Sequence, residues 1–473
     1  MSLEHPPFMR FSETPCQKPP LYEHGAPWLL EKITSRRESM PRRPHVDPEV
    51  ALSQGMSTIP STLPSEFIRK TAKETKWVER IKKIDPAIFF WNLVFGFGPS
   101  MERSLAALRK RLCTITAEAL APSSFFDRFN DRLVLFLEKI LQHLLTNTVR
   151  SELPRKVLDT FKDVLVIDST IVRLLDTLAE TFPGAGMPAG VKISTVLSVA
   201  TDNLHRMAIY AGKKAEIKTL KLGDWVKDCL LLFDLGFFAY AQFERILRLG
   251  GHFISRLHGN ADPEIIAVNK SCRGRAINLV GKRIRSCLSS LKREILDVMV
   301  KVEVPRRGYR GSNIKVPLVM RLIGIMNEET QEYHLYLTDL PFETFDAERI
   351  ADLYRGRWCV ELLFKELKSR YALDVIQTAK PEIVKALIYT AMITLVISRR
   401  IFVAYRDAMA RGGQVVTQEK WARFFVEHAG YLLRQILRLS KIEFTEELLL
   451  RLALQETISQ DPLRERLEAV WNG

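Results

Sequence analysis

The sequence predicts an α/β protein in which a sheet is flanked by helices. Two short apolar runs, at 164–168 and 230–234, have the length of buried strands, and each ends on an aspartate. The run at 381–405, PEIVKALIYTAMITLVISRRIFVAY, is apolar nearly all round and predicts a helix buried against the sheet. Between these elements, residues 260–339 alternate basic clusters with strand-like runs, which predicts a mainly β insertion.

Composition and charge indicate a globular protein with an anionic partner. The chain has 473 residues, 47% of them hydrophobic and 26% charged, and this length suggests roughly two to four domains. Its formal net charge of +15 favours nucleic acid as partner, since the release of condensed counterions drives that association. Ribosomal and membrane-surface proteins share such an excess. The six cysteines are scattered without metal-ligand spacing, which indicates reduced thiols and a cytoplasmic protein. The longest apolar runs, 87–97 and 386–397, are too short to span a membrane.

Two regions precede the predicted sheet. Residues 1–64 are rich in proline without sustained periodicity, which predicts a flexible arm. A solvated tail is the commoner role for its arginine pairs, and contact with DNA backbone is the alternative: Arg36, Arg37, Arg42 and Arg43. Residues 65–150 have helical periodicity, with a break at 122–124 before a long helix at 125–145. That helix carries Arg128, Asn130 and Arg132, so the outline fits a helix-turn-helix and a plain helical bundle equally well.

The sheet-forming part begins at 151–258. After the strand that ends on Asp168, two alternating runs joined by TDNL predict a hairpin, and a helix is expected around Trp225. The strand that ends on Asp234 leads into a helix through 243–249 and a further strand, HFISRL. Nearby histidines have no ligand spacing and are expected to be structural: His205, His252 and His258.

The remaining regions are the β-rich insertion at 259–340, a second part of the core at 341–410 and a helical C-terminal segment at 411–473. The insertion is expected to present a basic surface made of three clusters: Lys270, Arg273 and Arg275; Lys282, Arg283 and Arg285; Arg306, Arg307 and Arg310.

One stretch, 354–368, organises the functional hypothesis. Read as a single helix, it places Tyr354, Arg357, Glu361 and Lys368 on one face. An ordinary solvated face of an amphipathic helix is the commoner explanation for such a row on spacing alone. A carboxylate between cations is, however, also the composition that suits phosphate binding beside a metal ion.

Three carboxylates stand out by position: Asp168 and Asp234 at strand ends, and Glu361 on the polar helix face. A lone aspartate at a strand end is usually a turn former or a helix cap. Two strand-borne aspartates and one helix-borne glutamate that converge at a sheet edge could instead hold two Mg²⁺ ions. Such ions activate an attacking hydroxyl and stabilise the leaving oxygen of a phosphodiester.

These residues resemble a known family. The spacing Tyr-x₂-Arg-x₃-Glu-x₆-Lys at 354–368, together with IDST at Asp168 and FDLGF at Asp234, is similar to the DDE transposases of prokaryotic insertion sequences that bear this signature. The resemblance extends over about 76–405 and includes DPAIFFWNLVFGF and SSFFDRF.

The resemblance implies an RNase H-like mixed sheet with flanking helices, interrupted by the β-rich insertion, and a helical N-terminal region that binds DNA. It implies Mg²⁺ or Mn²⁺, as two ions, bound by Asp168, Asp234 and Glu361, which would catalyse DNA cleavage and strand transfer in cut-and-paste transposition. The implied contacts with transposon-end DNA are made by four residues: Tyr354, Arg357, Lys368 and Trp358. Trp358 would stack on a flipped base, and a core position suits it equally. Double-stranded DNA and a homodimer on that DNA are the implied partners, and a catalytically silent DNA-binding repressor is the alternative function.

Overall fold

The computed structural model describes residues 46–442 apart from 80–83, 97–103, 117, 149–155, 270–277, 292, 308–312, 328, 372 and 374–375. Several predictions fall outside this part of the chain. They concern the arginines of the arm, the cluster of Lys270, Arg273 and Arg275, Arg310, and residues 443–473.

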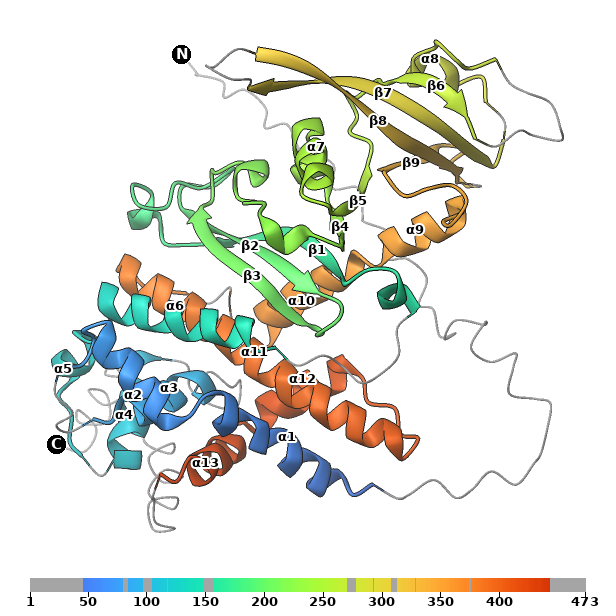
Figure 1. Ribbon diagram of the computed structural model, residues 1–473. Helices are drawn as coiled ribbons and strands as arrows, with labels where there is room; N and C mark the ends of the chain where they lie inside the picture. The colour runs from blue at the N-terminus through green and yellow to red at the C-terminus, as the bar shows by residue number, and fades with distance from the viewer. Residues whose placement is uncertain are drawn as a thin grey trace, which may run out of the picture. The chain divides into compact units, whose positions relative to one another are not determined.

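The described strands form one nine-stranded mixed sheet in the order β3-β2-β1-β4-β5-β9-β8-β7-β6 (Figure 1). Strand β1 pairs antiparallel with β2 and parallel with β4, and β4 pairs parallel with β5, whereas all later pairs are antiparallel. The strands are β1 (Asp163–Arg173), β2 (Gly190–Ser198), β3 (Asn203–Ala211), β4 (Cys229–Phe233), β5 (His252–Arg256), β6 (Glu264–Val268), β7 (Ile295–Arg307), β8 (Asn313–Met326) and β9 (Tyr333–Thr338). The predicted hairpin is present as β2 and β3, and residues 259–340 contain strands β6 to β9.

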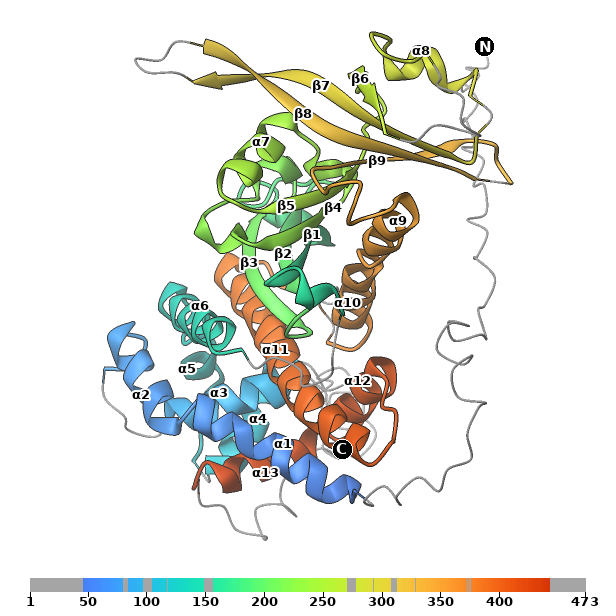
Figure 2. The same ribbon diagram turned by 45° about the vertical axis from the view of Figure 1, so that its right-hand side comes forward.

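The helices of the described residues are α1 (Pro48–Thr62), α2 (Ser65–Glu74), α3 (Pro86–Phe95), α4 (Leu105–Thr116), α5 (Pro122–Phe126), α6 (Asp131–Thr146), α7 (Tyr240–Arg248), α8 (Ile284–Leu288), α9 (Ala347–Arg355), α10 (Trp358–Ser369), α11 (Pro381–Arg411), α12 (Gln418–Glu427) and α13 (Ala429–Leu439). Figure 2 shows α9 and α10 in succession beside the strands of the core, where α9 contacts β5 and α10 contacts β1.

Strand periodicity divides the apolar side chains between two cores. In β4, Leu230 and Leu232 face one core and Leu231 and Phe233 face the other, because successive strand residues point to opposite faces. The larger core joins α10, α11 and the N-terminal helices to the sheet, and the smaller one contains α7 and the inner side of β7 and β8. Each side of the core strands is therefore covered, as expected for parallel strands.

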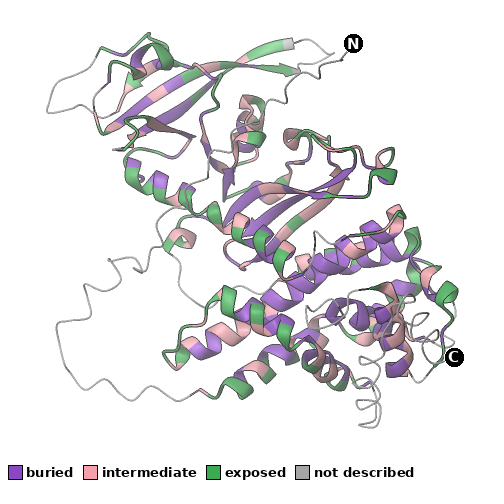
Figure 3. Cartoon of the chain, turned by 180° about the vertical axis from the view of Figure 1, so that it is seen from behind, coloured by how far each residue is buried: buried purple, intermediate pink, exposed green. Residues whose placement is uncertain are grey.

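Helix α11 confirms the prediction of a buried helix. It is long and apolar enough to cross a membrane, yet 89% of its most apolar window is buried inside the protein. It contacts α1, α6 and β3, and burial extends along most of its length (Figure 3). Length and composition alone would therefore misassign this core helix.

The prediction of a flexible arm is wrong for its last part, because α1 is an ordered helix. The side chain of Asp47 accepts a hydrogen bond from the backbone N–H of Glu49, and Pro48 occupies the first turn, where a missing N–H costs nothing. A Cβ on Gly55 would lie 3.1 Å from the carbonyl oxygen of Ile401, so the glycine permits close packing on α11. The proline content of residues 1–64 predicted an arm without structure, yet Pro48 starts a helix.

Two other local predictions are wrong. The long helix α6 begins at Asp131, six residues after the expected start, because the side chain of Asn130 accepts hydrogen bonds from the N–H groups of Arg132 and Leu133. Around Trp225 only a short 3₁₀ turn forms, Asp224–Val226, in place of a helix. Trp225 packs there against His205, whose pKa burial lowers to about 4, so this histidine is neutral and structural near pH 7.

Candidate active site

Asp168 and Asp234 lie side by side on neighbouring parallel strands. Strand β1 continues to Arg173, so the prediction that it ends on Asp168 is wrong: pairing with β2 extends the strand past the carboxylate. Ile167 pairs with Phe233, the last residue of β4, so the next residue of each strand carries an aspartate at the same level. The strand predicted to end on Asp234 is present and ends one residue earlier, at Phe233.

Tyr354 fixes the segment that carries Asp234. Its hydroxyl donates a 3.0 Å hydrogen bond to the carbonyl oxygen of Phe233, directly before the aspartate. Burial raises the pKa of Tyr354 to about 12, so the hydroxyl stays protonated and remains a donor. The side chain of Tyr354 therefore points into the protein, where α9 meets the end of β4.

The expected single helix over 354–368 is wrong. Helix α9 ends at Arg355, and α10 begins at Trp358 after a break at Gly356 and Arg357. The break separates the inward-facing Tyr354 from the helix that carries Glu361, so the four signature residues do not share one helix face. Uninterrupted periodicity could not reveal this, because the residues at the break keep right-handed helical dihedral angles.

Helix α10 holds Glu361 against the strands. Its buried face includes Val360, Leu363 and Leu367, which join the larger core. A buried ion pair of 2.8 Å between Glu366 and Arg399 ties the helix to α11. Removal of either charge would leave the other buried and unpaired, which costs about 3–5 kcal/mol in comparable pairs.

Arg357 joins the acidic residues through one guanidinium group. Its Nη2 donates to Glu361 Oε1 at 2.5 Å, and its Nη1 lies 3.4 Å from Asp168 Oδ2. The charge of Asp234 also acts on Arg357. Among the described residues, no group of three carboxylate, histidine or cysteine side chains is arranged to hold a metal ion. The guanidinium of Arg357 contacts both Asp168 and Glu361 in this arrangement.

The carboxyl of Asp168 is difficult to ionise. Its pKa is raised from 3.8 to about 6, mainly by burial and also by the charges of Asp234 and Glu216, while the Ser169 N–H and Arg357 oppose the rise. Because the pKa of Asp168 is higher in the folded state than in the unfolded state, the protonated carboxyl favours the folded protein. Its contribution to the free energy of unfolding is complete below about pH 4 and is lost as pH rises through about 6.

We therefore expect Asp168→Asn to stabilise the metal-free protein at pH 7.5 by about 1–3 kcal/mol, since a neutral amide avoids the cost of ionisation. The gain should disappear below about pH 4, where the wild-type carboxyl is protonated. Thermal unfolding of both proteins across this pH range measures the effect. A variant that is less stable than the wild type at pH 7.5 would contradict the expectation.

Trp358 and Lys368 lie on α10 with Glu361. Trp358 is 57% exposed, so the alternative of a core position is excluded. Lys368 is half-buried in the last turn, seven residues after Glu361 and hence on nearly the same side of the helix. Trp358 therefore precedes Glu361 on α10, and Lys368 follows it.

A fourth carboxylate, which the sequence did not suggest, lies beside the two aspartates. Glu216, in a 3₁₀ turn before β4, accepts a 2.6 Å hydrogen bond from the hydroxyl of Ser169. Lys192 lies 3.9 Å from the same carboxylate. Glu216 follows no apolar strand, so strand-end patterning could not find it. The only sequence signal was Gly236 after Asp234, which the carboxylate of Glu216 approaches closely.

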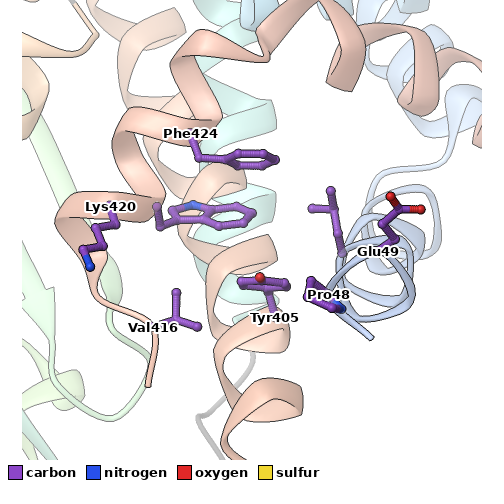
Figure 4. Close-up of a pocket in the computed structure, with 8 residues that line it drawn as sticks. Pro48, Glu49, Tyr405, Val416, Lys420 and Phe424 are labelled. Atoms are coloured by element: carbon purple, nitrogen blue, oxygen red, sulfur yellow. The ribbon is translucent and has the colours of Figure 1, made fainter. Parts of the chain in front are cut away.

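An apolar cavity of about 300 Å³ lies elsewhere, between α1, α11 and α12 (Figure 4). Its walls include Pro48, Tyr405, Trp421 and Phe424, and Glu49 and Lys420 contribute charged groups. None of the acidic residues of the candidate site lines this cavity. It is therefore separate from the acidic centre.

Comparisons with known proteins agree with this picture. The family model described as the transposase DDE domain matches residues 159–397, half of the chain. The chain is 24% identical over 380 residues to the transposase for insertion sequence element IS231F of Bacillus thuringiensis subsp. israelensis, covering 70% of this chain and 76% of that protein. It is also 24% identical over 366 residues to the transposase for IS1151 of Clostridium perfringens, covering 71% and 77%.

A piggyBac transposase in a synaptic complex with hairpin DNA aligns over 89% of this chain and 87% of that chain, with 12% identity and a TM-score of 0.43. The match of the family model to half of the chain, over the segment that carries Asp168, Asp234 and Glu361, identifies the family. The chain belongs to the transposases with a DDE domain.

Proposed function

We propose that this protein is an active, cytoplasmic transposase that binds the terminal inverted repeats of its insertion sequence and moves the element by cleaving and joining DNA strands. The observation that carries the proposal is that Arg357 contacts both Asp168 and Glu361, while Asp234 directly follows the strand that pairs beside Asp168. Three segments far apart in the sequence supply these groups, which local turn or capping roles do not explain.

The strand order supports an RNase H-like core. Strands β3, β2, β1, β4 and β5 are consecutive in the sheet, with two antiparallel pairs followed by two parallel pairs. The β-rich segment enters between β5 and α10, which carries the third acidic residue, as the resemblance implies. Adjacent strands with a packed helix form a rigid support for catalytic carboxylates.

The donor set fits divalent metal. Asp168, Asp234 and Glu361 would hold Mg²⁺ or Mn²⁺, since carboxylate oxygens are the preferred ligands of such hard cations. The bound ions, two in our proposal, would activate the attacking hydroxyl and stabilise the leaving oxygen. Asp168 Oδ1 accepts the Ser169 N–H, and Oδ2 faces Arg357. Arg357 must therefore release Oδ2 before that oxygen can serve as a ligand.

The same chain offers groups for element-end DNA. We assign Arg357 and Lys368 to backbone phosphates, since Arg357 contacts two of the acidic residues and Lys368 is a cation on the same helix as Glu361. Trp358 would stack on an unpaired base, because its ring is exposed. Tyr354 would act on the DNA contact indirectly, by fixing the segment before Asp234. The part of the chain that the structure describes contributes one such acidic centre and an element has two ends, so the complex would contain two copies.

A catalytically silent, DNA-binding repressor is the second candidate. The ion pairs of Arg357 with Asp168 and Glu361 favour it, because they neutralise the carboxylates without metal. Incubation of the full chain with labelled element ends, target DNA and Mg²⁺ separates the functions. Nicked ends and joined product are expected for the transposase, and end binding without any cleavage would support the repressor. Cleavage without joining would instead identify a nuclease.

A further inference from the structure

The connection between β3 and β4 places a polar cluster against the segments that carry Asp168 and Asp234. Glu216 begins a 3₁₀ turn in this connection, Glu216–Lys218, on the side of the sheet opposite to Asp168. The turn is anchored on both sides. Gln242 of α7 donates to the carbonyl oxygen of Ile217 at 2.9 Å, and the hydroxyls of Thr219 and Ser194 are 3.1 Å apart.

The carboxylate of Glu216 touches both segments that carry the catalytic aspartates. On one side it accepts a 2.6 Å hydrogen bond from Ser169, whose own N–H donates to Asp168 Oδ1 at 2.7 Å. On the other side its Oε2 occupies the space over Gly236, where an added Cβ would lie only 1.5 Å from this oxygen. Gly236 is two residues after Asp234.

Lys192 offsets the negative charge of Glu216, which lies near the two aspartates. Its ammonium lies 3.9 Å from Glu216 Oε1, and its side chain is only 7% exposed. A buried lysine needs a partner carboxylate, and Glu216 supplies it. Glu216 and Lys192 together are thus nearly neutral, and the hydrogen bond from Ser169 to Glu216 can persist without a large electrostatic cost.

We propose that Glu216 is a positioning residue of the transposase centre: it clamps the backbone after Asp168 to the turn after Asp234 and so sets the spacing of the two carboxylates. The inference rests on the proposed function, because that spacing matters for the two aspartates as shared metal ligands. Partners that orient ligands commonly contribute about 10–100-fold to metal affinity or activity.

Four variants of the full-length protein test the clamp. Glu216→Ala removes it, Glu216→Gln keeps an oxygen acceptor for Ser169, and Ser169→Ala removes the donor. Gly236→Ala should displace the carboxylate, because the group that it meets is the free end of a flexible side chain. Gly259→Ala is the matched control, since an added Cβ there meets nothing within 4 Å. Mn²⁺ binding to the DNA-free protein is read by the signal of free Mn²⁺ in electron paramagnetic resonance. Cleavage of element ends is measured against Mn²⁺ concentration.

Glu216→Ala should weaken Mn²⁺ binding and raise the Mn²⁺ concentration for half-maximal cleavage by about 10-fold, with end binding close to wild type. Its melting temperature should fall, because Lys192 loses its partner carboxylate. Gly236→Ala should match it in Mn²⁺ binding, and Glu216→Gln should recover most of the loss. The double variant Ser169→Ala, Glu216→Ala should bind Mn²⁺ as well as Glu216→Ala alone, because both substitutions remove the same hydrogen bond.

Unchanged Mn²⁺ binding in both Glu216→Ala and Gly236→Ala would overturn the clamp, as would fully additive losses in the double variant. These outcomes leave the proposed function intact when the wild-type protein still cleaves and joins ends. A wild-type protein that never cleaves refutes the proposed function instead. The DNA-free Mn²⁺ measurement then still decides whether Glu216 orders the aspartates.

Discussion

Replacement of Asp168, Asp234 or Glu361 by its amide, as Asp168→Asn, Asp234→Asn or Glu361→Gln, should lower cleavage of element ends by about three orders of magnitude. That loss corresponds to about 4 kcal/mol of transition-state stabilisation, which is within what bound metal ions contribute to such displacements. Binding of the ends in the absence of metal should change little, since each substitution removes a metal ligand and leaves the basic groups in place. Cleavage rate and end affinity are measured on the same labelled DNA.

Asp352→Asn is the matched control for these amides. Asp352 lies on α9 near the site, is exposed, and pairs with Arg355. Its loss should leave cleavage near the wild-type rate, because exposed ion pairs contribute little. An amide variant at one of the three positions that cleaves as fast as Asp352→Asn would remove that position from the proposed metal site. Thermal unfolding of Asp168→Asn, which we expect to be more stable than the wild type at pH 7.5, separates a loss of activity from unfolding.

Much of the sheet could be predicted because its strands are apolar over a few residues and end near turn signals. The runs before Asp168 and Asp234 are of this kind, as are those of the insertion, and the structure contains a strand at each. The end of β1 could not be predicted, since residues 169–173 continue only because β2 pairs with them. Non-local pairing of this kind leaves no mark on local periodicity.

The fold brings the acidic residues together, whereas side-chain contacts determine their hydrogen bonds and ion pairs. Spacing suggested that Arg357 and Glu361 are neighbours, and they are. It did not suggest that Arg357 reaches Asp168, 189 residues earlier, nor that Tyr354 turns inward to Phe233. Glu216 was missed because its role comes from contacts with Ser169 and Gly236 alone. Tertiary contacts, and no sequence motif, define this residue.

Removal of Arg357 should affect DNA and metal in opposite directions. In the free protein its two terminal nitrogens neutralise Asp168 and Glu361. Under the proposed function, the same guanidinium binds backbone phosphate when an element end is present, so phosphate and carboxylates compete for it. An end that draws Arg357 away makes Asp168 Oδ2 and Glu361 Oε1 available as ligands. By reciprocity, metal binding must also favour DNA binding.

We expect Arg357→Ala to bind Mn²⁺ more tightly than the wild type without DNA, because its two carboxylates lose their competing cation. Affinity for element ends should fall about 10-fold, and the dependence of log affinity on log salt should become shallower by about 1, as for one lost phosphate contact. Arg357→Lys should restore little of the wild-type behaviour, since one ammonium group cannot bridge both carboxylates as the planar guanidinium does. Arg355→Ala, which removes a neighbouring exposed arginine, serves as the control.

The coupling is tested by measuring Mn²⁺ binding with and without an element end in both proteins. In the wild type the DNA should strengthen Mn²⁺ binding, and in Arg357→Ala that enhancement should be largely absent, since no guanidinium remains to be transferred. Equal enhancement in the two proteins would mean that Arg357 does not link the sites, and its ion pairs would then be structural. A loss of enhancement together with tighter Mn²⁺ binding has no such explanation. A purely structural ion pair, once broken, would disorder the carboxylates and weaken their hold on the ion.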